Sequence, residues 1–289
     1  MLASVLWGTT GTAASFLPDS VSPIAIGAST MTVGGLLLFA FSARLSIAAI
    51  SDPASRPWLA LGALGVFVYP LAFYSAMDQA GVAIGNVVAL GSGPIFAALL
   101  EWLWERHRLS LRWLSCASIA IVGVVLLSTG RISQSEGGKS IPVGVVLGLL
   151  AGLAYALYTY ASTRALAAGH GGRGVMGGMF GLGAVLLAPV LLATGAPLLG
   201  SWHSVGIAGY LAIGPMFLAY LLFGFGLRSI RSSVATTVTL IEPLVATVLA
   251  ILVVHERLTL TGWIGFSLIL VGVTLLVSAR RPGKMTGPS

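Results

Sequence analysis

The sequence predicts an all-α polytopic membrane protein with ten transmembrane helices, arranged as two inverted repeats of five helices. Of its 289 residues, 57% are hydrophobic and only 8% are charged, whereas charged residues make up about 25% of an ordinary globular domain. Most apolar runs are about 18 to 24 residues long, which is enough for a helix to cross the hydrocarbon core of a bilayer. Residues 94–131 are also repeated without a gap as residues 243–280. The short alternating strands of a membrane barrel do not occur in the sequence.

The apolar runs divide the chain into two halves of five spans. The first five spans are expected near residues 2–17, 21–43, 58–79, 83–104 and 110–129, and the second five near residues 141–166, 173–194, 202–227, 231–254 and 260–279. The first run is short and has no basic segment before it, so we expect a helix rather than a cleaved signal peptide. The expected domains are a first repeat at residues 1–131, a linker at 132–140, a second repeat at 141–280 and a cytoplasmic tail at 281–289.

The repeat is visible as identical residues at a constant offset. Aligned 149 positions apart, the two copies agree at 14 of 38 positions. Pro94 pairs with Pro243 and Gly123 with Gly272, which shared apolar composition explains less readily than a pair of leucines. A unit of five spans ends on the opposite side of the membrane from where it began, so the second unit must enter inverted. Many secondary transporters are built in this way.

The basic residues predict the orientation of the chain. If both termini lie in the cytoplasm, twelve Lys and Arg residues fall on the cytoplasmic side and three on the other side, as the positive-inside rule requires. The net charge of +7 forms no continuous basic stripe, so no nucleic-acid partner is expected. Cys116 is the only cysteine and lies within a span, which excludes an intrachain disulfide.

Motifs for other chemistry are incomplete. Residues 137–140 resemble the end of a phosphate-binding loop, but Ser133 stands where that motif requires its first glycine. The four histidines lie at span ends or in loops, far apart in sequence, and no HExxH motif occurs. The sequence therefore predicts that the chain is not an enzyme and has neither a metal site nor a cofactor.

Polar and aromatic residues gather on six of the ten spans. All seven tyrosines fall on the third, sixth and eighth spans, and the first span carries Trp7 followed by several threonines. Because polar side chains are costly when they face lipid, spans 1, 3, 4, 6, 8 and 9 are predicted to surround a central cavity. Spans 2, 5, 7 and 10 would then face the lipid bilayer or form the contact of a homo-oligomer. Glycines at residues 144, 148 and 152 predict close packing of the sixth span.

Glu242 is the most informative single residue, because it lies in the middle of the ninth span and precedes Pro243. Proline removes a backbone donor and frees a carbonyl about one turn earlier, so the helix should be interrupted there. The repeat partner Pro94 follows Gly-Ser-Gly at residues 91–93, and a second interruption is expected at that point. Paired interruptions near the membrane midplane favour a substrate site. Three roles stay open for Glu242: binding a substrate ammonium group, carrying a coupling proton, or only shaping the bend.

Twelve residues are predicted to bind substrate. For each tyrosine the alternative is a hydrogen bond to a neighbouring helix. Glu101 and Glu105 lie near a span end beside basic residues, so ion pairing or interfacial solvation should explain them. The predicted substrate-binding residues are Trp7, Thr10, Tyr74, Asn86, Leu90, Pro94, Tyr155, Tyr158, Tyr220, Thr237, Thr239 and Glu242.

Several short motifs resemble a known family. Ile-Glu-Pro-Leu at residues 241–244 and His-Glu-Arg-Leu at 255–258, followed by Gly262-Trp263, resemble the second EamA repeat of the drug/metabolite transporter superfamily. Trp7-Gly8 resembles the start of the first repeat, so the resemblance covers essentially the whole chain. In the first copy, Arg-His-Arg-Leu at residues 106–109 replaces the pattern His-Glu-Arg-Leu, and the glutamate is displaced to Glu105. A role shared by the glutamates of the two copies is therefore in doubt. The resemblance implies ten helices, a cavity between the halves and alternating access without ATP.

Within the superfamily, the sequence is most similar to bacterial exporters of amino acids, in particular aromatic ones. The expected function is therefore a multi-pass transporter of the inner membrane that exports amino acids or related small metabolites. One alternative is a broad-specificity efflux carrier for cationic drugs, favoured if Glu242 is ionised and open to the cavity. Another is a membrane-embedded enzyme, for which no catalytic cluster is visible in any span.

Overall fold

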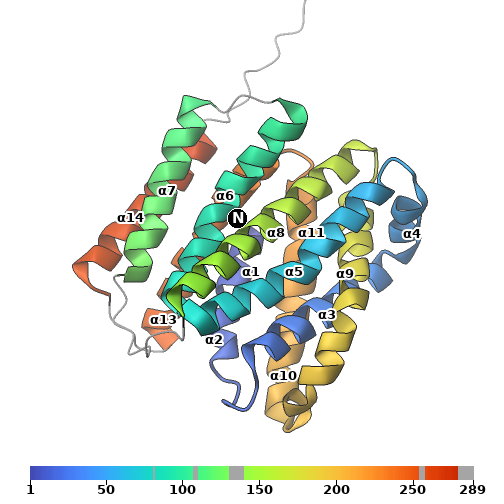
Figure 1. Cartoon of the computed structure of the whole chain (residues 1–289), viewed down its shortest axis with the longest axis horizontal. Helices are drawn as coiled ribbons and strands as arrows, with labels where there is room; N and C mark the ends of the chain where they lie inside the picture. Colours follow the sequence, from blue (N-terminus) through green and yellow to red (C-terminus); the bar gives the residue numbers. More distant parts are fainter. Residues whose placement is uncertain (81, 107–109, 130–139, 254–257, 279–289) are drawn as a thin grey trace, which may run out of the picture.

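The fold of the chain consists of helices, as the sequence predicts. A computed structural model describes residues 1–80, 82–106, 110–129, 140–253 and 258–278, and every regular element among them is a helix (Figure 1). The predicted tail and all of the predicted linker except Ser140 lie outside the described residues. The glycines and lysine of the loop-like motif at 137–140 and the first three residues of the motif at 255–258 also lie outside them.

The described part of the first half contains seven helices. In order they are α1 (Leu2–Gly8), α2 (Thr10–Ala14), α3 (Pro23–Phe41), α4 (Ala43–Ser51), α5 (Arg56–Ala80), α6 (Val82–Glu105) and α7 (Leu111–Thr129). The first predicted span is therefore two short helices, separated at Thr9, whose side-chain hydroxyl donates to the carbonyl of Leu6 at 2.7 Å. Helix α4 is an addition to the prediction. It follows a break at Ser42, whose hydroxyl donates to the carbonyl of Leu38 at 2.7 Å.

The described part of the second half has two predicted spans that change their winding, the eighth at a π-helical segment and the ninth at a 3₁₀ turn. Its elements are α8 (Ile141–Ala167), α9 (Gly172–Thr194), the 3₁₀ turn η1 (Ala196–Leu199), α10 (Trp202–Leu211), the π-helical segment η2 (Ala212–Leu218), α11 (Ala219–Gly226), α12 (Ser232–Val238), the 3₁₀ turn η3 (Thr239–Ile241), α13 (Glu242–Val253) and α14 (Leu260–Ser278).

Seven helical segments of the described residues are long and apolar enough to cross a membrane. They are Pro23–Phe41, Arg56–Ala80, Gly85–Glu105, Ile141–Ala167, Gly172–Thr194, Trp202–Gly226 and Ser232–Val253. Two shorter apolar stretches, Leu111–Leu127 and Leu260–Leu276, correspond to the predicted fifth and tenth spans. A polytopic membrane protein is thus supported, whereas ten spans, their inversion and the cytoplasmic position of both termini stay predictions.

Of the two predicted helix interruptions, one occurs. The ninth span is broken by η3 immediately before Glu242 and Pro243, as the missing proline N–H predicts. The interruption predicted at residues 91–94 is wrong, because α6 continues as an α-helix through Pro94. Packing against α8 explains the difference. A Cβ added to Gly93 would lie only 2.9 Å from Cδ1 of Tyr155, so this part of α6 is held against its neighbour and has no room to unwind.

Helix contacts in one half of the chain have counterparts in the other. Helix α7 packs along α14, α3 along α9 and α6 against α12, so three spans each contact the span five places later. Helix α5 of the third span packs along α8 of the sixth span. In the corresponding way, α1 of the first span packs against α11 of the eighth span. Figure 1 shows α7 and α14 side by side at one edge of the bundle. The predicted close packing of the sixth span is confirmed, since a Cβ on Gly144 would lie 2.6 Å from the backbone nitrogen of Ala80.

Candidate functional site

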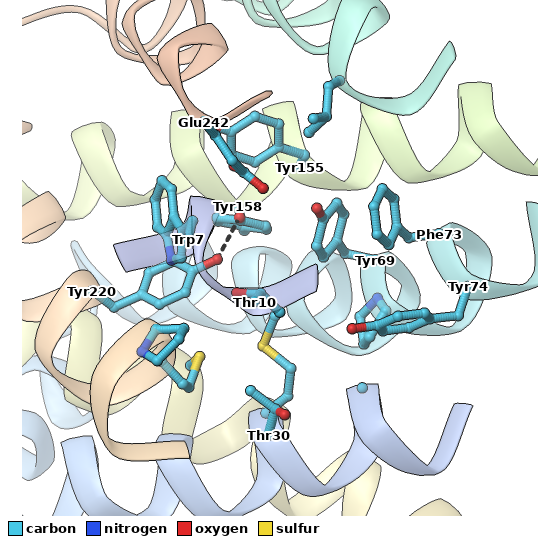
Figure 2. Close-up of a pocket in the computed structure, with 16 residues that line it drawn as sticks. Trp7, Thr10, Thr30, Tyr69, Phe73, Tyr74, Tyr155, Tyr158, Tyr220 and Glu242 are labelled. Atoms are coloured by element: carbon cyan, nitrogen blue, oxygen red, sulfur yellow. Dashed lines mark hydrogen bonds between the residues drawn. The ribbon is translucent and has the colours of Figure 1, made fainter. Parts of the chain in front are cut away.

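A central cavity lies between helices of both halves. It contains about 650 Å³ of space outside the atoms, counting the open solvent at its mouth. Figure 2 shows Glu242 and several aromatic side chains around it. Eight of the twelve residues that the sequence singled out line this cavity, and their role in binding substrate is a proposal. They are Trp7, Thr10, Tyr74, Leu90, Tyr155, Tyr158, Tyr220 and Glu242.

The other four predicted residues do not line the cavity. Asn86 and Pro94 belong to α6, where Pro94 is buried. Thr237 is fully buried, and its hydroxyl donates to the carbonyl of Ser233 at 2.7 Å. Thr239 lies behind Tyr155 and reaches the cavity only through that side chain. The threonine hydroxyls of the ninth span therefore form hydrogen bonds mainly to backbone carbonyls of their own span. This is expected because a helix points most of its side chains away from any one cavity.

Aromatic rings form a continuous wall of the cavity. The centroid of Trp7 lies 5.0 Å from that of Tyr220. Tyr158 lies 6.2 Å from Tyr220 and 5.4 Å from Tyr155, and Tyr69 lies 5.9 Å from Tyr155. These separations are those of tilted and edge-to-face aromatic pairs. The wall can therefore take the flat or apolar part of an organic molecule from more than one side.

Three tyrosine hydroxyls of this wall, those of Tyr155, Tyr158 and Tyr220, are hydrogen-bonded to one another or to Thr239 of η3. The hydroxyl oxygens of Tyr158 and Tyr220 lie 2.8 Å apart (Figure 2). Tyr155 and Thr239 are joined by a hydrogen bond of 2.5 Å. Because the hydroxyl of Thr239 already donates to the carbonyl of Thr236 at 2.8 Å, Tyr155 must donate to Thr239. Tyr155 therefore presents an acceptor to the cavity, while the pair of Tyr158 and Tyr220 retains one hydroxyl hydrogen.

Glu242 brings the only carboxylate among the described residues that line the cavity. It is the first residue of α13, and η3 directs its side chain toward Tyr155 and Tyr158 (Figure 2). No hydrogen bond or ion pair joins its carboxylate to another described residue. Among the described lining residues there is also no Lys, Arg or His. An unpaired carboxylate at membrane depth is able to bind an ammonium group or to accept a proton.

Helix α3 contributes part of the cavity wall, although its span was predicted to face the lipid bilayer or an oligomer contact. Gly27, Thr30 and Met31 line the cavity. A Cβ on Gly27 would lie 2.7 Å from Cδ2 of Tyr74, so only glycine lets this ring lie against α3. The polar run Ser29-Thr30 and Thr32 inside an apolar span was the available signal. Pro215 and Met216 of η2 also line the cavity and were not predicted.

Thr30→Val should weaken substrate binding without destabilising the fold. The Thr30 hydroxyl is buried, lines the cavity and has no hydrogen-bond partner among the described residues. If it bonds to substrate, its loss costs about 1 kcal/mol, or roughly fivefold in apparent affinity. The melting temperature should not fall, because no bond within the protein is broken. Thr32→Val is the matched control, since Thr32 is equally buried and unpartnered in the described structure but lies outside the cavity wall. Equal affinities of the two variants in a substrate-exchange assay would exclude Thr30 from binding.

Known proteins match the chain over almost its full length. The model of the EamA-like transporter family matches residues 1–129 and 142–278. The uncharacterized transporter YwfM of Bacillus subtilis is 31% identical over 287 residues, covering 98% of this chain and 94% of the relative. The uncharacterized inner membrane transporter YicL of Salmonella typhimurium is 25% identical, covering 98% and 96%. A solved crystal structure shares the fold with a TM-score of 0.79 at 22% identity, covering 98% of this chain and 96% of the other.

Proposed function

Because the chain belongs to the EamA-like transporter family, we propose that it is a secondary transporter that exports amino acids, above all aromatic ones, or related small metabolites by alternating access. Membrane transport itself follows from the family and from the names of its relatives. The predicted multi-pass location in the inner membrane is confirmed by relatives named inner membrane transporters and by the seven helical segments of spanning length. The predicted EamA family is likewise confirmed.

The cavity is the observation that carries the substrate class. Its aromatic wall offers stacking and apolar contact to a ring of the substrate. The carboxylate of Glu242 offers a partner to an ammonium group at the same site. An aromatic amino acid carries both groups within one small molecule.

Alternating access in this proposal uses two related units of five helices. The recurrence of helix contacts supports such a relation, since α3, α6 and α7 each pack against the helix five spans later. The 14 matched residues of the two repeat copies support it independently. With an odd number of spans in each unit, the units would be inverted, and the excess of basic residues supports a cytoplasmic position for both termini.

One observation favours a second candidate function, the efflux of organic cations. The described lining residues include Glu242 but no Lys, Arg or His, so the carboxylate of an amino acid would lack a charged partner there. A substrate with an ammonium group and no carboxylate would match this cavity better, because burying an unpaired charge is costly. The two candidates therefore differ in one chemical group of the substrate.

Exchange by the purified full-length chain in proteoliposomes separates these candidates. Vesicles loaded with unlabelled phenylalanine, tyrosine or tryptophan should take up the labelled form of the same amino acid faster than protein-free vesicles. Matched assays would use phenethylamine, tyramine and tryptamine, which keep the ring and ammonium group but lack the carboxylate. Exchange of the amines alone would select the cation carrier. Exchange of none of the six compounds would overturn both the aromatic amino acids and their amines as the substrate class.

A further inference from the structure

Glu101 is a buried carboxylate outside the cavity wall. Its residue is only 2% exposed, so interfacial solvation does not apply. It accepts three hydrogen bonds, all from the start of α12. The hydroxyl of Ser232 donates at 2.7 Å and the backbone N–H of Ser233 at 2.8 Å, both to Oε1, while the Ser233 hydroxyl donates to Oε2 at 2.8 Å.

These bonds join the two halves of the molecule. Glu101 belongs to α6 in the first half, whereas Ser232 and Ser233 begin α12 in the second. One turn later on α6, Glu105 pairs with Arg164 at 3.4 Å and with Arg231 at 3.0 Å, again across the two halves. Ion pairing predicted for Glu105 is therefore confirmed. We refer to the end of the bundle where α6 ends and α12 begins as the latch end, and its basic residues assign it to the cytoplasm.

At the opposite end of the molecule, a wide pocket contains about 1010 Å³ of space, counting solvent, and its wall includes Phe16, Trp202 and Tyr210. Trp202 is 91% exposed, in contrast to Glu101. Thr9 lines this wide pocket, and its hydroxyl is hydrogen-bonded to that of Tyr210 at 2.7 Å. Glu101 thus joins the two halves at the latch end, whereas the wide pocket at the other end is lined by residues of both halves.

Helix α12 has space to move if Glu101 releases it. A separate cleft of about 630 Å³, counting solvent, lies against α12 at Ala235, Val238 and Thr239. Among the described residues, the side chains of Ala235, Val238 and Thr239 make one polar contact to another helix, the bond from Tyr155 to Thr239, and Thr239 also bonds to its own turn. Ten residues separate Ser232 from Glu242, a distance of about 15 Å along a helix. A shift of α12 away from α6 would therefore reach the cavity at Glu242.

We propose that Glu101 is a positioning residue that latches α12 against α6 and keeps the cavity closed at the latch end. Its release separates α12 from α6, opens a path between the cavity and this end, and closes the opposite end. A buried carboxylate is an expensive way to join two helices unless its bonds are exchanged during function. This proposal rests on alternating access as proposed above, but it is independent of the substrate.

Cysteine accessibility of the full-length chain in nanodiscs tests this proposal without any substrate. Two reporters are placed in a Cys116→Ala background. Thr236→Cys lies one turn after Ser232 and replaces a fully buried residue, and Thr12→Cys lines the wide pocket at the other end. Glu101→Gln loses the charge and one acceptor. It should raise the maleimide labelling rate of Thr236→Cys about tenfold, because charge-assisted hydrogen bonds are lost, and lower the rate of Thr12→Cys.

The controls separate a latch from a cap that only stabilises the fold. Glu105→Gln removes partly exposed ion pairs and should change either rate by less than about threefold. If Glu101→Gln raises both rates together, or changes neither, Glu101 is no latch. Should Glu101→Gln fail to give monodisperse protein, Ser233→Ala decides, because it removes one donor and leaves the carboxylate in place. It should shift the two reporters in opposite directions by about threefold. Because no substrate is present, a failed exchange assay leaves this result unaffected.

Discussion

Glu242→Gln is expected to reduce substrate exchange at least about thirtyfold while the protein remains folded and in the membrane. Glutamine keeps the size of the side chain but removes the only negative charge among the described lining residues of the cavity. A substrate ammonium group would then lose its charged partner in a desolvated site. The carboxylate makes no hydrogen bond or ion pair with another described residue, so folding should lose nothing. Counterflow in proteoliposomes measures the exchange, and size-exclusion chromatography with a melting temperature measures the fold.

The matched control for this experiment is Glu105→Gln, which makes the same chemical change at a partly exposed ion pair outside the cavity. It should exchange substrate at nearly the wild-type rate. Wild-type exchange by Glu242→Gln at every pH would remove Glu242 from the mechanism. Exchange that persists but no longer responds to an imposed pH gradient would instead assign Glu242 to proton coupling and not to binding.

Gly8→Ala is expected to reduce exchange at least about tenfold and to lower the melting temperature. A Cβ on Gly8 would lie 2.6 Å from Cβ of Val245 and 2.9 Å from the carbonyl oxygen of Glu242. Alanine favours a helix over glycine by about 1 kcal/mol, whereas such overpacking typically costs about 1 to 3 kcal/mol. The clash should therefore prevail and push α13 away from α1. Because the contact is made at Glu242 itself, the carboxylate moves with it.

Gly11→Ala provides the control for the clash, because it makes the same substitution one turn later. A Cβ on Gly11 meets nothing within 4 Å, so this variant should retain both exchange and melting temperature. A Gly8→Ala protein with wild-type exchange would show that the crossing of α1 and α13 adapts to a methyl group and does not position Glu242. If both variants lose exchange equally, backbone flexibility around Thr9 is the cause, and not the contact with α13.

The cavity could be predicted in large part because its residues differ in type from their surroundings. Tyrosines and a glutamate inside apolar spans are costly in lipid, so their positions alone indicated which helices enclose the cavity. The contribution of α3 was not predicted because it depends on Gly27. The need for glycine at this position is evident only from the structure, in which the ring of Tyr74 lies against it. The hydrogen bonds of Glu101 were not predicted because its partner Ser232 is 131 residues away in the sequence.

Local rules were reliable where tertiary packing did not oppose them. Pro243 interrupts its span as expected, since η3 precedes it. Pro94 also lacks a backbone N–H donor, yet α6 continues through it because α8 packs closely against Gly93. The first span is divided at Thr9, whose hydroxyl donates a hydrogen bond to the preceding turn. The apolar composition of the span does not predict this bond. Sequence periodicity thus locates helices, while neighbours decide whether they bend.

The broken ninth span has no broken counterpart in α6, and this bears on the kinetics of transport. If the halves exchanged roles without any difference, substrate would meet equivalent sites and equal barriers on both sides of the membrane. With a joint at η3 in one half only, the inward-facing and outward-facing states of the proposed alternating-access cycle would differ in energy. For an uncoupled carrier the ratio Vmax/KM must still be the same in both directions, whereas Vmax and KM separately need not be. An uncoupled carrier of this kind is therefore expected to saturate at different substrate concentrations on its two faces.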